Sequence, residues 1–333
     1  MSHSFEIPPR LSLAQTPTPL QPLNRLSDRF GGPRIWLKRD DLTGSVLSGN
    51  KIRKLEFILA RALEQGCDTL ITCGGLQSNH CRATALIGAQ LGLKVCLVLR
   101  GRPDGFPDGN YLLDQLAGAE IRTYSAHTYQ AELPKLLDAW ADECREQGLK
   151  PWVIPTGASD SHGAWGYVQA SRELQADYRQ CHITPEYVVS ACGSGGTLAG
   201  LFLGHQAYCP KTQVLGMAVC DDAEYFRQKV DADIDTLCRL YSIKLTPNPD
   251  QLEVNDAYIG EGYAQAGPEV FDTIRLLAAT EGVVLDPVYT GKAFHGLLTE
   301  LKNGRFQDCN DIVFVHTGGV FGLFPYREFL ASP

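Results

Sequence analysis

Along this chain, apolar runs rich in Val and Ile alternate with segments in which apolar and polar positions follow a helical period, and a glycine usually stands where one pattern gives way to the other. Between residues 52 and 63 apolar side chains recur at helical spacing, and Gly66 then supplies a stop signal. The segment DTLITCGG, residues 68–75, is a short continuous apolar run of the kind found in buried strands. These periods predict a helix that opens near residue 51 and a strand that follows it.

The same alternation continues to the end of the chain. A helix is predicted over 78–92, with Ser78 or Asn79 as its cap, and a longer helix over 130–148. Repeated strand, helix, strand units indicate an α/β protein whose mainly parallel, twisted sheets are flanked by helices. Because no linker separates two halves, we expect one domain inserted in another. Buried strands are predicted at 94–99, 119–124, 151–155, 186–192, 213–220 and 311–319.

Composition narrows the class of partner. The 333 residues carry a formal net charge of -8, which argues against general affinity for nucleic acid or an anionic membrane. No segment resembles a signal peptide or is long enough to cross a bilayer, so we expect a cytoplasmic protein that binds small molecules. Eleven cysteines without a C-x-x-C pair indicate reduced thiols, with neither a disulfide framework nor a metal site.

A dense cluster of small residues follows one predicted strand. The stretch VVSACGSGGTLAGL, residues 188–201, places glycine, serine and threonine between a strand and a helix. Small residues let several backbone N–H groups converge at a helix N terminus, which is how proteins bind phosphate. The cluster is neither G-x-G-x-x-G nor Walker A. We interpret it as a phosphate loop; the alternative is a plain strand-to-helix turn.

Two further stretches carry polar groups at predicted helix starts. Gln77, Ser78, Asn79 and His80 stand in a row where a carboxylate could accept backbone N–H bonds, although helix capping alone would explain one of them. Lys51 opens a helix, where the dipole disfavours a cation. A solvated surface lysine is one explanation. The other is an imine with pyridoxal phosphate, which also needs a phosphate cup and a partner for its ring nitrogen.

Five motifs occur in one order along the chain: SGNKIRKLEF, QSNH, CGSGGT, LDPVYTGKA and HTGG. Together they resemble the pyridoxal-phosphate enzymes of the D-cysteine desulfhydrase and 1-aminocyclopropane-1-carboxylate deaminase group, which have the tryptophan synthase β-like fold, or fold type II. The resemblance runs from about residue 18 to 319. It implies a large cofactor-binding domain from 1–49 and 163–333, a small domain inserted at 50–162, an active site between them, and a homodimer.

The resemblance also implies roles for individual residues. Lys51 corresponds to the lysine that forms the Schiff base with pyridoxal 5'-phosphate, and Lys54 to a lysine that supplies positive charge to the phosphate. Asn79 corresponds to the residue that bonds the phenolic oxygen of the cofactor. The phosphate loop corresponds to Gly193, Ser194, Gly195, Gly196 and Thr197.

Catalytic and substrate-binding roles follow in the same way. Lys51 is the expected base, because a desolvated amine can have a lowered pKa, and Ser78 and Tyr289 are alternative proton carriers. For Tyr289 the alternative to a catalytic role is a packed aromatic ring with a satisfied hydroxyl. His80 and His316 are interpreted as structural. The expected substrate contacts are Gln77, Ser78, Asn79, Tyr263 and Tyr289.

Two positions separate the branches of this group. Deaminases have a glutamate after the tyrosine of D-P-V-Y and a leucine before the final G-G, where this chain has Thr290 and Thr317. A glutamate keeps the ring nitrogen of the cofactor protonated, whereas a threonine hydroxyl such as that of Thr317 only shares a hydrogen bond. The weaker electron sink suffices for a good leaving group. The hypothesis is α,β-elimination of D-cysteine to pyruvate, hydrogen sulfide and ammonia.

Other readings stay open. A deaminase of the cyclopropane amino acid, or a lyase for another β-substituted amino acid such as L-cysteate, would use the same cofactor. A non-catalytic nucleotide-binding or sensor module could share the sheet and the glycine-rich turn, but would not need Lys51 and Asn79. The segments PTGASDSHGAWGY at 155–167 and VFGLF at 320–324 depart from the pattern of the desulfhydrases, and both departures bear on the size or charge of the substrate.

Overall fold

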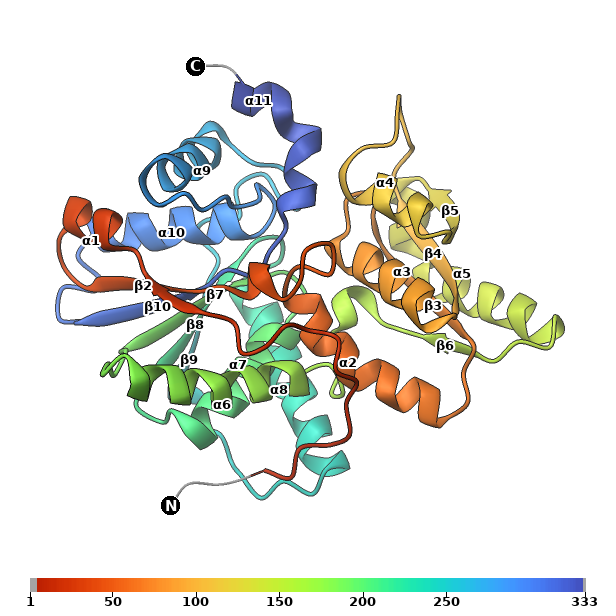
Figure 1. The fold of residues 1–333 in the computed structure, drawn as a ribbon, viewed down its shortest axis with the longest axis horizontal. Coiled ribbons are helices and arrows are strands. Elements are labelled where there is room, and N and C mark those ends of the chain that lie inside the picture. The colour runs from red at the N-terminus through yellow and green to blue at the C-terminus, as the bar shows by residue number, and fades with distance from the viewer. Residues whose placement is uncertain (1–4, 332–333) are drawn as a thin grey trace.

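The larger of two β-sheets has six strands in the order β1-β2-β10-β7-β8-β9 (Figure 1). The structure is a computed structural model that describes residues 5–331. β1 runs antiparallel to β2 and every other neighbouring pair is parallel. The strands are β1 (Leu20–Pro22), β2 (Arg34–Lys38), β7 (Tyr187–Cys192), β8 (Gln213–Ala218), β9 (Leu252–Asn255) and β10 (Asp311–Val315).

The second sheet has four parallel strands in the order β5-β4-β3-β6. They are β3 (Thr69–Gly75), β4 (Lys94–Arg100), β5 (Glu120–Tyr124) and β6 (Pro151–Val153). The expected α/β class, with two mainly parallel sheets flanked by helices, is therefore confirmed. The sequence pattern missed the strands β1, β2 and β9. It also placed the start of the helix at 126–146 four residues too late, because Ser125 caps that helix.

Helices cover both faces of each sheet, so successive strand residues are buried on opposite sides. Val188 of β7 packs with α6, α7 and α8, whereas the adjacent Val189 packs with α1, α9 and α10. In the smaller sheet, α2 and α3 cover one face and α5 covers the other. The helices are α1 (Asn24–Phe30), α2 (Asn50–Glu64), α3 (Asn79–Leu91), α4 (Gly109–Leu116), α5 (Ala126–Glu146), α6 (Trp165–Gln180), α7 (Gly196–Tyr208), α8 (Ala223–Leu240), α9 (Pro268–Glu281), α10 (Thr290–Lys302) and α11 (Arg327–Ala331).

Helix α2, which carries Lys51, is anchored in the cores of both sheets. Ile52 and Leu55 belong to the core of the smaller sheet, and Phe57 packs on Trp165 in the core of the larger one. Burying apolar side chains on two faces fixes the rotation of the helix about its axis. The direction in which Lys51 points is therefore set by packing on both sides.

A buried ion network ties α2 to the larger sheet. Arg53 contacts Asp40 at 2.7 Å (Nη2 to Oδ1) and Glu173 of α6 at 3.0 Å (Nη1 to Oε2). Tyr167 donates its hydroxyl to Asp40 at 2.6 Å. Burial by itself favours the neutral acid, but the Arg53 charge and its hydrogen bonds outweigh burial and hold the pKa of Asp40 below its usual value. The buried charges are tolerated because each is paired with an opposite charge and hydrogen-bonded.

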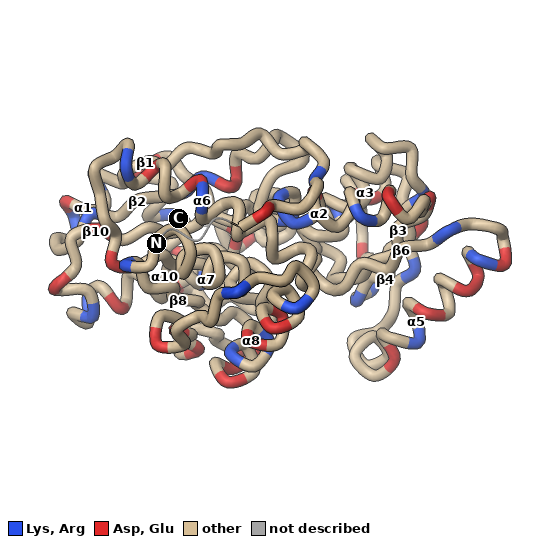
Figure 2. The backbone as a smooth tube through the Cα atoms, turned by 90° about the horizontal axis from the view of Figure 1, so that it is seen from below, with Lys and Arg blue, Asp and Glu red and all other residues tan. Residues whose placement is uncertain are grey.

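The distribution of charged residues and the state of the cysteines are those of an ordinary globular protein. Acidic and basic residues are interspersed along α5 and α8 (Figure 2). None of the helices within residues 5–331 combines the length and the apolar character that a bilayer crossing requires. All eleven cysteines are free thiols, and six of them are buried.

Candidate active site

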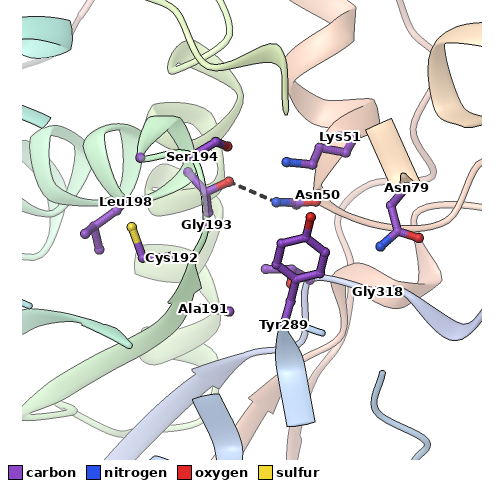
Figure 3. A pocket seen from close by; sticks show the side chains of 13 residues that line it. Asn50, Lys51, Asn79, Ala191, Cys192, Gly193, Ser194, Leu198, Tyr289 and Gly318 are labelled. Atoms are coloured by element: carbon purple, nitrogen blue, oxygen red, sulfur yellow. Dashed lines mark hydrogen bonds between the residues drawn. The ribbon is translucent and has the colours of Figure 1, made fainter. Parts of the chain in front are cut away.

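Lys51 and the predicted phosphate loop line one cavity between the two sheets, here called the loop cavity. Asn50, Lys51 and Asn79 stand on one side of it, Gly193 and Ser194 on the other, and Tyr289 between them (Figure 3). The complete lining is Asn50, Lys51, Asn79, Ala191, Cys192, Gly193, Ser194, Gly195, Thr197, Leu198, Tyr289, Thr317 and Gly318. Residues from all five motifs thus meet at the carboxyl ends of parallel strands, where ligands bind in such sheets.

The phosphate loop has the shape of an anion site. Strand β7 ends at Cys192, and α7 begins at Gly196 with Gly195 as its cap. Gly195 has φ +83°, a conformation that favours glycine. A Cβ on Gly193 would come within 2.8 Å of the Tyr289 ring, so the backbone lies directly against that side chain. The backbone N–H groups at the start of α7 carry the positive end of the helix dipole.

The start of α2 is docked on both the phosphate loop and the final glycines. Gly49 has φ +105°, and a Cβ there would stand 2.8 Å from the Thr317 carbonyl oxygen. The Asn50 backbone N–H donates to that carbonyl at 3.1 Å, and its side-chain Nδ2 donates to Thr197 Oγ1 at 3.0 Å. Lys51 is therefore held at a fixed distance from the loop. Asn50 was missed by sequence reasoning, although it lies inside the SGNK motif.

The Lys51 amine has a perturbed pKa. Its Nζ donates to the Gly157 carbonyl oxygen at 3.3 Å, and no carboxylate of the described residues lines the loop cavity. Removal of the ammonium from water lowers the pKa of Lys51 to about 8. A perturbed lysine without an acidic partner, in a cavity, indicates a nucleophile or base more than a structural cation. This answers the objection that the helix dipole raises against a charged lysine there.

Lys54 lies one turn further along α2, beneath the phosphate loop. Its Nζ donates to the Gly157 carbonyl oxygen and to Ser159 Oγ, both at 2.8 Å. Ser159 Oγ in turn contacts Ser194 Oγ at 2.7 Å and accepts the Gly196 N–H at 3.2 Å. Burial, then repulsion by Lys51, lowers the pKa of Lys54 well below its usual value. A bound phosphate would reverse that penalty by supplying opposite charge.

Ser159 and Gly157 were also missed by sequence reasoning. Both lie in the segment 155–167, whose departure from the family pattern was the available signal. A Cβ on Gly157 would stand 2.5 Å from Ser194 Oγ and 3.2 Å from Lys51 Nζ. Only a residue without a side chain leaves room for this approach between the lysine and the loop.

A second cavity, here called the tyrosine cavity, adjoins the first and has a volume of about 310 Å³. Within it the hydroxyls of Tyr263 and Tyr289 lie 2.7 Å apart. Burial raises the pKa of Tyr263 to about 12 and that of Tyr289 well above its usual value, so both phenols are protonated near neutral pH. Its lining is Lys51, Gly74, Gly75, Ser78, His80, Arg100, Tyr129, Thr156, Gly157, Gly193, Ser194, Cys220, Asp221, Tyr263 and Tyr289.

The residues of the QSNH motif divide between the cavities. Ser78 lines the tyrosine cavity and caps α3, its Oγ accepting the Cys81 N–H at 3.1 Å. Asn79 lines the loop cavity and accepts from Asn110 at 2.9 Å (Nδ2 to Oδ1). Gln77 lines neither of them, because its amide is bonded to the backbone of Asp108 and Asn110. The structure therefore brings Ser78 and Asn79 to the site and directs Gln77 away from it.

The two threonines that separate the family branches occupy different environments. Thr317 lines the loop cavity. Thr290 is buried at the start of α10, where its hydroxyl donates to Asp286 Oδ1 at 2.7 Å, and it lines neither cavity. Of the two, Thr317 has the position to contact a ligand.

His80 and His316, which belong to the motifs QSNH and HTGG, are neutral, and each contacts a neighbouring protein group through its ring. Burial lowers the pKa of His80 well below its usual value, and its Nε2 lies 2.7 Å from Thr72 Oγ1. Burial also lowers the pKa of His316, whose Nδ1 accepts the Gly318 N–H at 3.3 Å, so Nε2 donates to the Val284 carbonyl oxygen at 3.1 Å. These contacts support the structural interpretation of the two side chains.

We expect the reactivity of Lys51 to follow its lowered pKa. In cofactor-free protein, acetylation of Lys51 by acetic anhydride should rise about tenfold per pH unit and level off above pH 8, because only the neutral amine attacks. Peptide mass spectrometry measures the extent, with the exposed Lys150 as internal reference for reagent decay. A rate that keeps rising steeply beyond pH 9 would contradict the assigned environment.

Comparison with known proteins gives one consistent result. A family model described as pyridoxal-phosphate dependent enzyme matches residues 11–318. A bifunctional D-cysteine desulfhydrase/1-aminocyclopropane-1-carboxylate deaminase of Arabidopsis thaliana is 41% identical, over 99% of this chain and 82% of that protein. A D-cysteine desulfhydrase of Yersinia enterocolitica is 41% identical over 98% of both chains. The crystal structure of an ACC deaminase homologue, 40% identical, superposes with a TM-score of 0.87 over 97% of this chain and 95% of that one.

The site fits the cofactor that this family uses. A perturbed amine without an acid partner and a glycine loop at a helix N terminus share one cavity, with the buried Lys54 beneath the loop. A Cβ on Gly196 would stand 2.8 Å from Ser159 Oγ and 2.9 Å from Lys54 Nζ, so the cradle admits no larger residue. Both the match along the chain and this donor set lead to one conclusion: the chain belongs to the family of pyridoxal-phosphate-dependent enzymes.

Proposed function

We propose that this enzyme is a lyase that carries out α,β-elimination on a small amino acid, with D-cysteine as its leading substrate. One water is consumed, and pyruvate, hydrogen sulfide and ammonia are released. The names of the relatives from Arabidopsis and Yersinia support the reaction class. The observation that carries the choice within that class is the wall of the loop cavity, which presents Thr317 and no carboxylate among the described residues.

We assign the loop cavity to the cofactor. The start of α7 and Lys54 would hold the phosphate, Asn79 the phenolic oxygen, and Lys51 the aldehyde carbon. Pyridoxal phosphate supplies an electron-withdrawing ring that makes the Cα proton of an attached amino acid acidic. Lys51 Nζ takes that proton as the neutral amine, which its pKa of about 8 makes available near neutral pH. Lys54 remains beneath the loop as the counter-charge of the phosphate.

The tyrosine cavity is assigned to the substrate. The N terminus of α3, capped by Ser78, offers backbone N–H groups to the substrate carboxylate. The Tyr263 and Tyr289 hydroxyls, 2.7 Å apart and protonated, can pass a proton toward the departing β-substituent. A shared proton between two phenols costs little reorganisation, because the donor and the acceptor are already in contact.

A panel of D- and L-amino acids tests the proposal. Products are assayed as sulfide, sulfite, pyruvate and 2-oxobutanoate. Pyruvate and sulfide from D-cysteine, without product from L-cysteine, would support D-cysteine as the substrate. Release of 2-oxobutanoate from 1-aminocyclopropane-1-carboxylate would instead establish the deaminase and overturn the argument from Thr317.

We expect Thr317→Glu to slow elimination from D-cysteine by about tenfold. The change places a carboxylate in a wall that has none, where it would favour a protonated ring nitrogen over a shared hydrogen bond. Pyruvate release at saturating cofactor gives kcat, and Thr317→Ser, which keeps the hydroxyl, is the matched control. Equal kcat in all three proteins would remove ring-nitrogen tuning from the proposal.

Two expectations about organisation also stay proposals. The division into 1–49 with 163–333 and an inserted 50–162 is supported by the strands, because every strand of the smaller sheet lies within 69–153. Limited proteolysis would test it. The homodimer implied by the family resemblance would be tested by light scattering.

A further inference from the structure

The tyrosine cavity contains a cation that the proposed elimination does not use. Arg100 is the last residue of β4 and lines this cavity with Tyr129 and Tyr263. Its guanidinium carbon lies 4.9 Å from the ring centroid of Tyr263 and 5.8 Å from that of Tyr129. Two aromatic rings therefore flank the planar group, which limits its movement.

No acid neutralises this arginine. Within residues 5–331 no carboxylate lies within ion-pair distance of Arg100, in contrast to Arg122 on the next strand. Arg122 stacks on Trp140 at 4.2 Å and also pairs with Glu143 at 2.6 Å (Nη2 to Oε2). A stacked arginine with uncommitted donors, facing a cavity, is suited to bind a carboxylate, sulfonate or phosphate.

The other charged groups of this cavity do not change that conclusion. Asp221 is exposed at its rim, where water screens its charge, and it accepts from Cys220 Sγ at 3.1 Å. Lys51, on the side of the loop cavity, adds no negative charge. His80 is neutral because burial lowers its pKa. The interior of the cavity therefore favours an anion.

We propose that Arg100 is a specificity-determining residue that binds an anionic β-substituent and extends the elimination to amino acids with a sulfonate side chain. This inference rests on the proposed function. The substrate carboxylate already has a place at the N terminus of α3, so Arg100 is available for a second anionic group. With cysteate, the Cα–H and Cβ–S bonds break, the sulfur group leaves with the bonding electron pair as sulfite, and one water yields pyruvate and ammonia.

The test compares a substrate that has an anionic β-substituent with one that has a neutral β-substituent, in each of three proteins. The kcat/KM for pyruvate release is measured with cysteate and with β-chloroalanine, both enantiomers of each, for the wild type, Arg100→Gln and Arg100→Lys. We expect Arg100→Gln to lower kcat/KM for cysteate by about 10- to 100-fold relative to β-chloroalanine, mainly through KM. The kcat/KM of Arg100→Lys for cysteate should lie between those of the wild type and Arg100→Gln, because lysine keeps the positive charge and loses the planar, bidentate donor geometry of arginine.

Arg122→Gln is the matched control, since it removes a stacked arginine outside the cavity and should leave the cysteate to β-chloroalanine ratio unchanged. Calorimetry with aspartate, an acidic amino acid without a leaving group, supplies a readout other than turnover. We expect aspartate to bind wild type and to lose about 10- to 100-fold in affinity in Arg100→Gln.

The outcomes separate the two proposals. Pyruvate from β-chloroalanine, with a cysteate ratio and an aspartate affinity unaffected by Arg100→Gln, would overturn the role of Arg100 and leave the elimination standing. Absence of pyruvate from both β-chloroalanine and D-cysteine would overturn the proposed function itself, and the substrate role of Arg100 with it.

Discussion

Replacing Lys51 with alanine is expected to lower kcat for pyruvate release by about 10³- to 10⁴-fold, the largest effect of any single change in this site. The amine both anchors the cofactor and moves the Cα proton in the proposed reaction. Its environment is specific: the part of the chain that the structure describes places no acid in the loop cavity, and burial lowers the pKa of Lys51 to about 8. Among residues 5–331 no other lysine lines either cavity, so no described neighbour can take its place.

The same variant has a spectroscopic signature. Wild-type protein incubated with pyridoxal phosphate and then dialysed should be yellow, and Lys51→Ala should lose the visible band while keeping the melting temperature of cofactor-free protein. Lys150→Ala, at an exposed position, is the control and should behave as wild type. Partial recovery of turnover in Lys51→Ala by added methylamine would support the proton-transfer role. A colourless wild type that takes up no pyridoxal phosphate would contradict the assignment of the site.

Asp40→Asn is expected to lower the free energy of unfolding by about 3–5 kcal/mol, the largest stability effect of a single substitution. The side chain is fully buried and accepts from Arg53 through both oxygens, as well as from Tyr167 and Thr18. An amide cannot accept at both positions, and it leaves the Arg53 cation partly uncompensated in the interior. Urea denaturation at pH 7 measures the change.

Two comparisons keep this test specific. Asp142→Asn removes one partner of the exposed pair with Arg145 and should leave the urea midpoint unchanged within error. The pKa of Asp40 is depressed, so its contribution is fully present above its ordinary value of 3.8 and is lost only as the pH falls through the lower folded value. A wild-type midpoint for Asp40→Asn at pH 7 would show that the network contributes no net stability.

Local patterns in the sequence were sufficient for most elements. Short apolar runs located β3, β4, β5, β6, β7, β8 and β10, and the helical period located helices such as α2 and α3, because buried strands and amphipathic helices leave local patterns of apolar residues. They missed β2 at Arg34–Lys38, a short apolar run that ends in a lysine. Lys38 is nonetheless buried, since Glu173 and Asp177 of α6 neutralise it. A charged residue whose partners lie far away in the sequence is predicted from local pattern to be at the surface.

The site divides in the same way. Lys51, Asn79 and the loop at 193–197 could be proposed as site residues from the sequence because each lies in a contiguous motif at the start of a helix, and these motifs carry the family resemblance. Thr290 and Thr317 could not be distinguished in this way, although only Thr317 lines the loop cavity. Gln77 lies in a matching motif, yet its amide is bonded elsewhere.

The chain's own order of residues therefore determined the fold class, the positions of most strands and helices, and the motifs that start α2, α3 and α7, because these depend on interactions between near neighbours. Tertiary structure placed Lys51 with Gly193 and Gly195 around one cavity, as the family resemblance implied. It alone decided that Ser159 joins Lys54 to the loop and that Tyr129 and Tyr263 flank Arg100. The reason is physical: burial, charge compensation and ring stacking depend on which groups meet in space, and a local pattern carries no record of a partner more than a hundred residues away.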